Sequence, residues 1–266
     1  KILREGYSVT VPNRAAAYFN CFATSKSPAD VLREMRAIAQ KAALLTASQV
    51  EYSATKMRGL GYAGPVTPWT IPVMTFAEIY AAATQKHGGA DAVSGHVQAF
   101  LQRRNEADAA AGVSSDLRDL ALAVWQEIFI LSGLTGPMII VGFLPPYYPP
   151  RRPHDRTPQH AAMLRVVDKT IAKAKNDYGL TIEQADLFMG LCDLSYFGFQ
   201  GDKGELTELA ENMPGWEQVY SIPVPALLKL DVPVMNLSVK GWDAHKMTER
   251  LEKNFSLRIL PELIHY

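Results

Sequence analysis

Residues 145–158 read "PPYYPPRRPHDRTP" and make the sharpest change of composition in the chain. Each proline fixes its own φ, lacks a backbone N–H and disfavours helix in the residue before it, so the stretch predicts an extended segment. We therefore place the main boundary of the chain here. A stiff interdomain crossing is the simpler interpretation. The tyrosines and arginines leave open that the segment is also a strip that recognises a ligand.

Before this boundary, the sequence predicts a compact layer of strands and helices with its own core. Ser27 and Pro28 are typical of an N-cap and a first helical position, and apolar residues then recur with the period of a helix. Thr75 is predicted to cap a second helix. The predicted elements are a strand at 14–24, helices at 28–45 and 76–88, a short edge strand at 70–76, helices at about 91–111 and 115–132, and a buried strand at 137–144.

After the boundary, strands and helices are again predicted to alternate. A clear helix begins at Pro158 and stops at Gly179. A strand and turn at 185–199, a short helix from 204, a strand from 232 and helices at 245–251 and 258–266 follow. This alternation favours the α/β class, with a mixed or parallel sheet covered by helices.

Composition excludes several classes of partner. The 266 residues contain 27 basic and 27 acidic side chains without a long block of one sign, so nucleic acid and anionic membranes are not expected as partners. The longest apolar stretches fall short of the ~20 residues that a spanning helix needs. Two distant cysteines, Cys21 and Cys192, favour a reducing cytoplasm over a disulfide scaffold.

The first candidate for chemistry is the stretch "GWDAHKMTERL", residues 241–251. His245 is expected just past a buried strand, where a neutral imidazole suits zinc if other ligands arrive from elsewhere. Asp243 lies two residues before it, and Glu249, four residues after it, could orient the ring from the same face of a helix. The alternative is that Asp243 is an ordinary N-cap and His245 an exposed residue of the first turn.

The second candidate is "MGLCDLSYFGF", residues 189–199. Cys192 is conceivable as a nucleophile, but a buried inert thiol is the more common role of such a residue. Asp193 could orient a substrate or cap a turn. The other histidines, including His154 and His160 beside the proline stretch, form no His-x-x-x-His or His-Glu-x-x-His motif, and no nucleotide-binding glycine loop is present.

These two stretches together resemble the C-terminal end of the dinuclear zinc aminoacylase and carboxypeptidase family, which includes acetylornithine deacetylase and succinyl-diaminopimelate desuccinylase. The strings "RAAAYFN", "PPYYPP", "AENMPGW" and "DAHKMTER" most resemble its RocB-like branch, linked with arginine utilisation, and span almost the whole chain. The residues that carry the family pattern are Gly190, Cys192, Asp193, Val232, Pro233, Val234, Gly241, His245 and Glu249.

The resemblance implies an inserted α/β lid domain followed by the C-terminal half of an α/β catalytic domain. The implied division is 1–13 as an incoming linker, 14–145 as the lid and dimerisation domain, 146–157 as the crossing and 158–266 as the catalytic half. The family's first half supplies a His-x-Asp pair, a bridging Asp and a Glu-Glu pair. This sequence has neither His-x-Asp nor two adjacent glutamates, and it begins without an initiator Met. We therefore expect the ligand-bearing half to lie outside this chain.

By the same resemblance, His245 is the last zinc ligand, Asp193 is a wall residue of the active site, and Cys192 replaces the family's usual Thr or Ser. The implied activity is hydrolysis of N-acyl amino acids or small peptides with two zinc ions and a general base outside this chain. The chain alone is expected to be inactive. It is also expected to form a cytoplasmic homodimer through the lid. The alternative is a non-catalytic binding or scaffold protein that keeps the fold.

Overall fold

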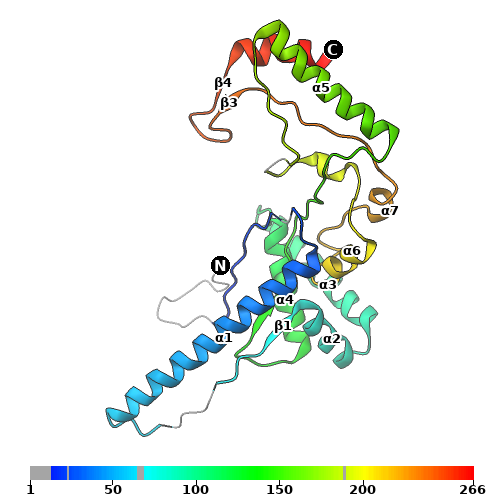
Figure 1. Ribbon diagram of the computed structural model, residues 1–266. Helices are drawn as coiled ribbons and strands as arrows, with labels where there is room; N and C mark the ends of the chain where they lie inside the picture. Colours follow the sequence, from blue (N-terminus) through cyan, green and yellow to red (C-terminus); the bar gives the residue numbers. More distant parts are fainter. Residues whose placement is uncertain (1–12, 23, 65–68, 188–189) are drawn as a thin grey trace. The chain divides into compact units, whose positions relative to one another are not determined.

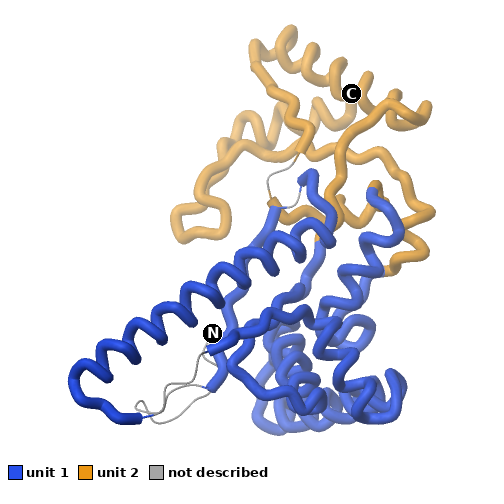
Figure 2. Tube along the Cα trace, turned by 60° about the horizontal axis from the view of Figure 1, so that its bottom comes forward, with its two compact units in different colours: residues 1–147, 201–222 blue, residues 148–200, 223–266 orange. Residues whose placement is uncertain are grey.

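The computed structural model describes residues 13–22, 24–64, 69–187 and 190–266. The chain divides into two compact units, which are described separately. The first contains Lys1–Tyr147 and Gly201–Ile222, and the second Tyr148–Gln200 and Pro223–Tyr266 (Figure 2). The division therefore falls inside the proline stretch. The linker expected at 1–13 lies almost wholly outside the described residues, and the roles assigned to the domains stay predictions.

The first unit is mainly helical (Figure 1). Its long first helix begins where the sequence predicts, because Ser27 and Asp30 form a reciprocal capping box. Thr75 and Glu78 form a second capping box at the start of α2, which confirms that expectation too. The elements are α1 (Pro28–Gly59), β1 (Val73–Thr75), α2 (Phe76–Lys86), α3 (Ala90–Ala110), α4 (Leu117–Ser132), β2 (Ile139–Val141) and α6 (Lys203–Glu211).

The sheet of this unit is a parallel pair of three-residue strands. β1 pairs with β2 in the register Val73↔Ile139 and Thr75↔Val141. Parallel neighbours need a crossover connection, and α2, α3 and α4 provide it. Leu32 and Ala39 of α1 pack against Val141. The mixture of helices and small sheets fits the α/β class, although the sheets are smaller than the sequence suggests.

The main core of the first unit lies among α2, α3 and α4. Each helix contributes a side chain that is completely inaccessible to solvent: Ile79 from α2, Val93 from α3 and Ile128 from α4. The three belong to one hydrophobic cluster. The apolar period of each helix places these side chains on its inner face. Further members of the cluster are Phe76, Ala83, Val97, Leu101 and Val124.

Residues 201–222 are tied into this unit by the buried side chain of Asn212. Its Oδ1 accepts a hydrogen bond from the backbone N–H of Ala77 at 3.1 Å, and its backbone oxygen accepts one from Phe143 at 2.8 Å. A Cβ on Gly142 would lie 2.7 Å from that same backbone oxygen. Only glycine therefore lets the two backbones approach this closely.

The second unit contains α5 (Pro158–Tyr178), a 3-10 helix η1 (Asp193–Phe197), α7 (Val224–Leu227), β3 (Gly241–Trp242), β4 (Arg250–Leu251), a π-helical turn η2 (Phe255–Ile259) and α8 (Leu260–His265). The helix from Pro158 and its stop at Gly179, which has φ 65°, confirm the sequence prediction. A small core joins Ala174 of α5 to Ile259 and Leu263. No described helix is long and apolar enough to cross a membrane.

Four predicted elements are wrong. The described residues of 185–199 contain the 3-10 helix η1 and one bridge position at Gly198, and no strand. Residues 14–22 form only one isolated bridge position rather than a strand, and the segment from 232 to 240 forms no strand. The helix predicted at 245–251 is replaced by turns and the antiparallel pair β3–β4, in the register Gly241↔Leu251. Asp243 and His245 have φ of 58° and 63°, in the left-handed region that an α-helix cannot use.

The core of the first unit can be tested with two isoleucines of α4. Ile128→Ala is expected to lower the free energy of unfolding by about 2–5 kcal/mol, because Ile128 is 0% exposed and its loss leaves a cavity. Ile130→Ala is the matched control, since Ile130 is 55% exposed on the same helix. Urea unfolding curves of both variants provide the measurement. Equal destabilisation would contradict this packing.

Candidate functional site

The proline stretch of the second unit is held in place by its side chains and backbone. Arg152 and Gln200 form a reciprocal pair: the backbone N–H of Arg152 donates to Oε1 at 2.8 Å, and Nε2 donates back to the Arg152 carbonyl at 2.8 Å. The rings of Tyr148 and Tyr196 lie 5.2 Å apart. The stretch is therefore a fixed wall against residues 196–200 and not a loose linker.

Thr157 connects the end of this stretch to the start of α5. It is the N-cap of the helix, and its Oγ1 accepts a hydrogen bond from the backbone N–H of His160 at 3.3 Å. The same hydroxyl lies 2.7 Å from Nδ1 of His160. One side chain thus caps the helix and fixes the orientation of a buried imidazole, which is only 4% exposed.

Asp231 is distant in sequence from His160 but lies beside it in the structure. Gly198 makes this possible, because it allows the backbone around Asp231 to approach closely. Asp231 and Gly198 form an isolated antiparallel bridge, and Val232 donates its N–H to the Phe197 carbonyl at 3.2 Å. A Cβ on Gly198, which has φ 152°, would lie 2.6 Å from the Leu230 carbonyl oxygen. The segment around Asp231 can therefore approach only because residue 198 lacks a side chain.

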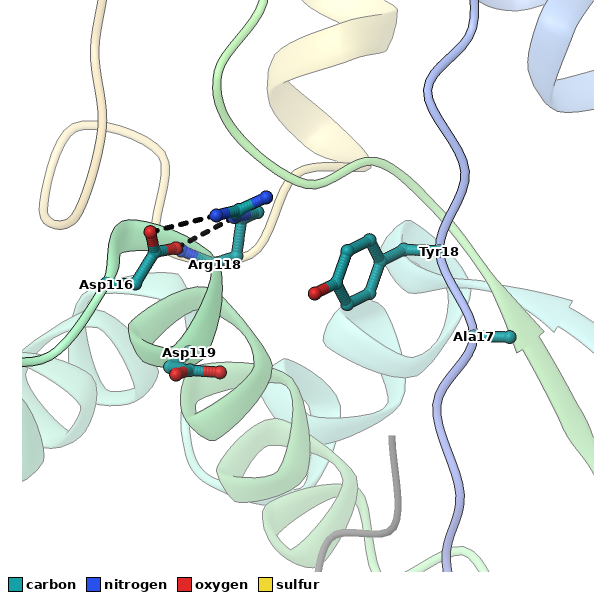
Figure 3. A pocket seen from close by; sticks show the side chains of 5 residues that line it. All are labelled: Ala17, Tyr18, Asp116, Arg118 and Asp119. Atoms are coloured by element: carbon teal, nitrogen blue, oxygen red, sulfur yellow. Dashed lines mark hydrogen bonds and ion pairs between the residues drawn. The ribbon is translucent and has the colours of Figure 1, made fainter. Parts of the chain in front are cut away.

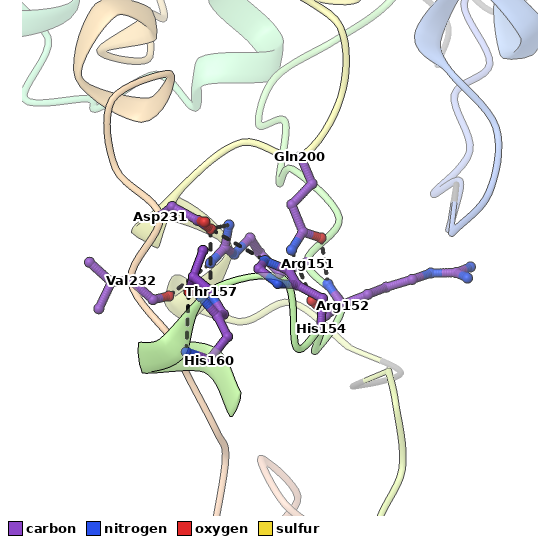
Figure 4. Close-up of polar contacts among 8 residues, drawn as sticks. All are labelled: Arg151, Arg152, His154, Thr157, His160, Gln200, Asp231 and Val232. Carbon is purple, nitrogen blue, oxygen red and sulfur yellow. Dashed lines mark hydrogen bonds and ion pairs between the residues drawn. The ribbon is translucent and has the colours of Figure 1, made fainter. Parts of the chain in front are cut away.

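Three side chains converge on one carboxylate oxygen in this unit (Figure 4). Oδ1 of Asp231 lies 3.3 Å from Nε2 of His160, 3.5 Å from Nε2 of His154 and 3.5 Å from Nη1 of Arg151. The two imidazole rings stack with their centroids 3.8 Å apart. Nη2 of Arg151 donates to the Val232 carbonyl at 2.8 Å. We call His154, His160 and Asp231 the imidazole–carboxylate cluster.

The cluster holds polar atoms that lack hydrogen bonds. Nε2 of His160, both ring nitrogens of His154, and Nε and Nη1 of Arg151 are inaccessible to solvent and form no hydrogen bond within the described chain. A buried polar group left in this state costs about 1–3 kcal/mol. Such a cost is commonly retained where a ligand completes the site.

Burial lowers the pKa of His160, and the neighbouring His154, Arg151 and Arg156 lower it further, while the carboxylate of Asp231 acts in the opposite direction. The balance favours the neutral imidazole at neutral pH. Neutral imidazole is the form that binds a metal ion or accepts a proton.

The hairpin formed by β3 and β4 brings together three of the residues predicted from the sequence. Oδ2 of Asp243 accepts hydrogen bonds from Arg250 at 2.6 Å and Thr248 at 3.1 Å. Glu249 accepts a bond at 3.1 Å from the backbone N–H of His245, not from its ring. The His245 ring is exposed and has no hydrogen bond or ion pair with any described residue.

The structure does not join Cys192 and Asp193 to this hairpin by any hydrogen bond or ion pair among the described residues. Cys192 is a half-buried free thiol at the start of η1, and Asp193 is the exposed first residue of that helix. The Cys192 carbonyl accepts a bond from Ser195 at 3.0 Å. These contacts are those of a helix start.

Sequence reasoning missed the imidazole–carboxylate cluster. His154 and His160 lie beside the proline stretch but form no ligand motif, and Asp231 lies 71 residues after His160. The available signal was "HDRTPQH", in which two histidines flank a Thr-Pro helix start. Nothing local could have indicated the third member.

A hollow in the first unit makes a weaker candidate. It has a volume of about 500 Å³ and is lined by Ala17, Tyr18, Asp116, Arg118 and Asp119 (Figure 3). The guanidinium of Arg118 donates to both carboxylate oxygens of Asp116, at 2.9 and 3.0 Å, and lies 5.9 Å from the centre of the Tyr18 ring. The charges of Arg118 and Asp116 thus pair with each other.

Two curated proteins of Bacillus subtilis (strain 168) are similar to the chain. Uncharacterized protein YqjN is 28% identical over 266 residues, which are 100% of this chain and 46% of YqjN. Protein RocB is 24% identical over 262 residues, which are 98% of this chain and 44% of RocB. The chain thus spans less than half the length of each. No protein-family model matches the sequence, and no solved structure matches it. The chain is therefore a distant relative of RocB.

The double role of Thr157 gives a prediction. Thr157→Ala is expected to lower the stability of the second unit by about 1 kcal/mol, because the N-terminal cap of α5 is lost. Thr157→Ser keeps the hydroxyl and is expected to retain most of that stability. Urea unfolding followed by circular dichroism compares the two variants. If serine and alanine destabilise equally, the hydroxyl is not the group that matters.

Proposed function

We propose that the chain is part of a RocB-like, zinc-dependent amidohydrolase that acts on N-acyl amino acids or small peptides, in arginine catabolism. The proposal rests on similarity to RocB along 98% of the chain. The resemblance of the stretch 241–251 to the zinc aminoacylase and carboxypeptidase family also supports it, because that resemblance implies a zinc-ligand role for His245.

The observation that carries the proposal is the free, exposed ring of His245. A ring that has no partner among the described residues can take a metal ligand role without breaking an existing contact. Its backbone is held by Glu249, and Arg250 and Thr248 fix the preceding Asp243. The residue is therefore presented on a closed turn. One imidazole fits one corner of a zinc site and cannot complete it.

The remaining ligands and the general base would come from a segment outside these 266 residues, in the same or a companion polypeptide. Bound zinc would supply an acidified water and polarise the scissile carbonyl. Within this chain, His245 would hold the metal, Asp243 and Glu249 would fix the turn that carries it, and Asp193 and Cys192 would line the substrate pocket. Residues 14–145 would form the lid and dimer contact.

A second candidate is a non-catalytic binding or scaffold protein with the same fold. The observation that favours it is the sequence itself, which contains neither His-x-Asp nor adjacent glutamates. On this alternative, the exposed His245 is an ordinary residue of a surface hairpin.

The two candidates differ in zinc content and hydrolysis. In the natural polypeptide that contains these residues, His245→Ala is expected to remove one zinc ion of the hydrolytic centre and to reduce hydrolysis of N-acyl amino acids at least about 100-fold, because a ligand is lost. Elemental analysis and a panel of N-acyl amino acids provide the measurements. His265→Ala changes another exposed histidine and should alter neither quantity.

Unchanged zinc content in His245→Ala would remove this residue from the metal site. A wild-type polypeptide that shows no hydrolysis, and whose zinc content is the same in His245→Ala, would favour the scaffold.

A further inference from the structure

We propose that the imidazole–carboxylate cluster binds a zinc-like divalent transition-metal ion through His154, His160 and Asp231. The site shares no residue with the proposed hydrolytic centre at His245. The proposed metal site can therefore be tested independently of the proposed function.

The spacing of the three side chains matches a tetrahedral metal site. Ligand atoms about 2.0–2.2 Å from a tetrahedral zinc ion stand about 3.3–3.5 Å from one another. Nε2 of His160 and Nε2 of His154 lie 3.3 and 3.5 Å from Oδ1 of Asp231. One ligand atom from each of the three residues lies within 4.8 Å of the other two. The two rings stack with their planes 25° apart, so binding one common ion requires an imidazole to turn out of the stack until both nitrogen lone pairs face the ion.

The unpartnered ring nitrogens are an independent observation that points to a ligand. His160 is 4% exposed, and its Nε2 lies close to the carboxylate without a hydrogen bond to it. Both ring nitrogens of His154 are likewise buried without a hydrogen bond. A bound cation would use one nitrogen of each ring and would sit between those nitrogens and the negative oxygen.

Thr157 provides the supporting contact that metal-binding histidines usually have. Its Oγ1 lies 2.7 Å from Nδ1 of His160 and also accepts the backbone N–H of that residue. A hydroxyl that accepts from Nδ1–H fixes the tautomer whose Nε2 carries a lone pair. In that tautomer the Nε2 lone pair faces the Asp231 carboxylate, an arrangement that repels unless a cation lies between them.

The ligand types, the exposure of Asp231 and the neighbouring Arg151 together indicate which kind of ion fits this site. Its side chain is 48% exposed, so one coordination position remains open to water or a small ligand. Two imidazoles select a transition metal over magnesium or calcium, which prefer oxygen ligands. Arg151 shares the carboxylate oxygen at 3.5 Å. Its positive charge opposes the ion, so we expect weaker binding than at a closed structural zinc site.

The test is titration of the metal-free 266-residue chain with Co²⁺, followed by displacement with Zn²⁺. Tetrahedral Co²⁺ absorbs visible light strongly, so the signal reports coordination and not activity. We expect one such ion per chain, displaced by Zn²⁺ but not by Mg²⁺ or Ca²⁺. Asp231→Asn and His154→Gln should each weaken Co²⁺ binding at least about 10-fold.

The controls separate this site from other histidines. His96→Gln changes an exposed histidine that is paired with Glu127, and His245→Gln changes the proposed hydrolytic ligand. Both should bind Co²⁺ at the cluster as the wild type does. Asp231→Asn keeps the size of the side chain, and circular dichroism checks that each variant is folded. The proposal is overturned if the wild type gives no tetrahedral signal. It is equally overturned if folded Asp231→Asn and His154→Gln bind as the wild type does, or if His245→Gln alone removes the signal.

Discussion

The buried amide of Asn212 is the interaction on which the first unit depends. Its side chain accepts the first-turn N–H of Ala77 in α2, and its Nδ2 donates to the Glu208 carbonyl in α6 at 3.1 Å. Its own carbonyl receives the N–H of Phe143, just after β2. If Asn212 were replaced by an apolar residue, the Ala77 N–H and the Glu208 carbonyl would lose this partner, whereas the bond from Phe143 to the backbone carbonyl of residue 212 would remain. One residue thus holds together segments that lie more than 60 residues apart in sequence.

This connection decides how the chain is divided. Residues 201–222 return to the first unit, so the polypeptide passes between the units at 147–148, 200–201 and 222–223. Gln200 and Arg152 pair beside two of these passages. In the second unit, the side chains around Asp231 come from segments that flank the passages, namely 151–160 and 231–232.

The sequence predicts elements well where the determining contacts are local. Ser27, Thr75 and Thr157 each cap a helix within three residues of themselves, and Gly179 ends α5. The strand expected from residue 232 failed because an apolar run forms a strand only when a neighbour pairs with it. The helix expected at His245 does not form because Asp243 and His245 adopt left-handed φ values. These values are explained by the turn that joins β3 to β4, which is not evident from the sequence.

The candidate sites show the same limit. Asp243, His245 and Glu249 are near in sequence, so their grouping was predictable, although Glu249 holds the backbone and not the ring. His154 and His160 are also near each other in sequence, but they form a candidate metal site only together with Asp231. That residue arrives only because Gly198 admits its backbone. Such a long-range contact has no local sequence pattern.

The position of Thr157 makes the first turn of α5 and the buried imidazole a single cooperative element. Opening of that turn breaks the hydrogen bond to the His160 amide and at the same moment releases the ring. The rate at which this amide exchanges its hydrogen with solvent therefore reports how often the cluster comes apart. When the first turn of α5 opens, the His160 ring also loses its fixed orientation. The stability of this one helical turn therefore sets how long the arrangement around Asp231 persists.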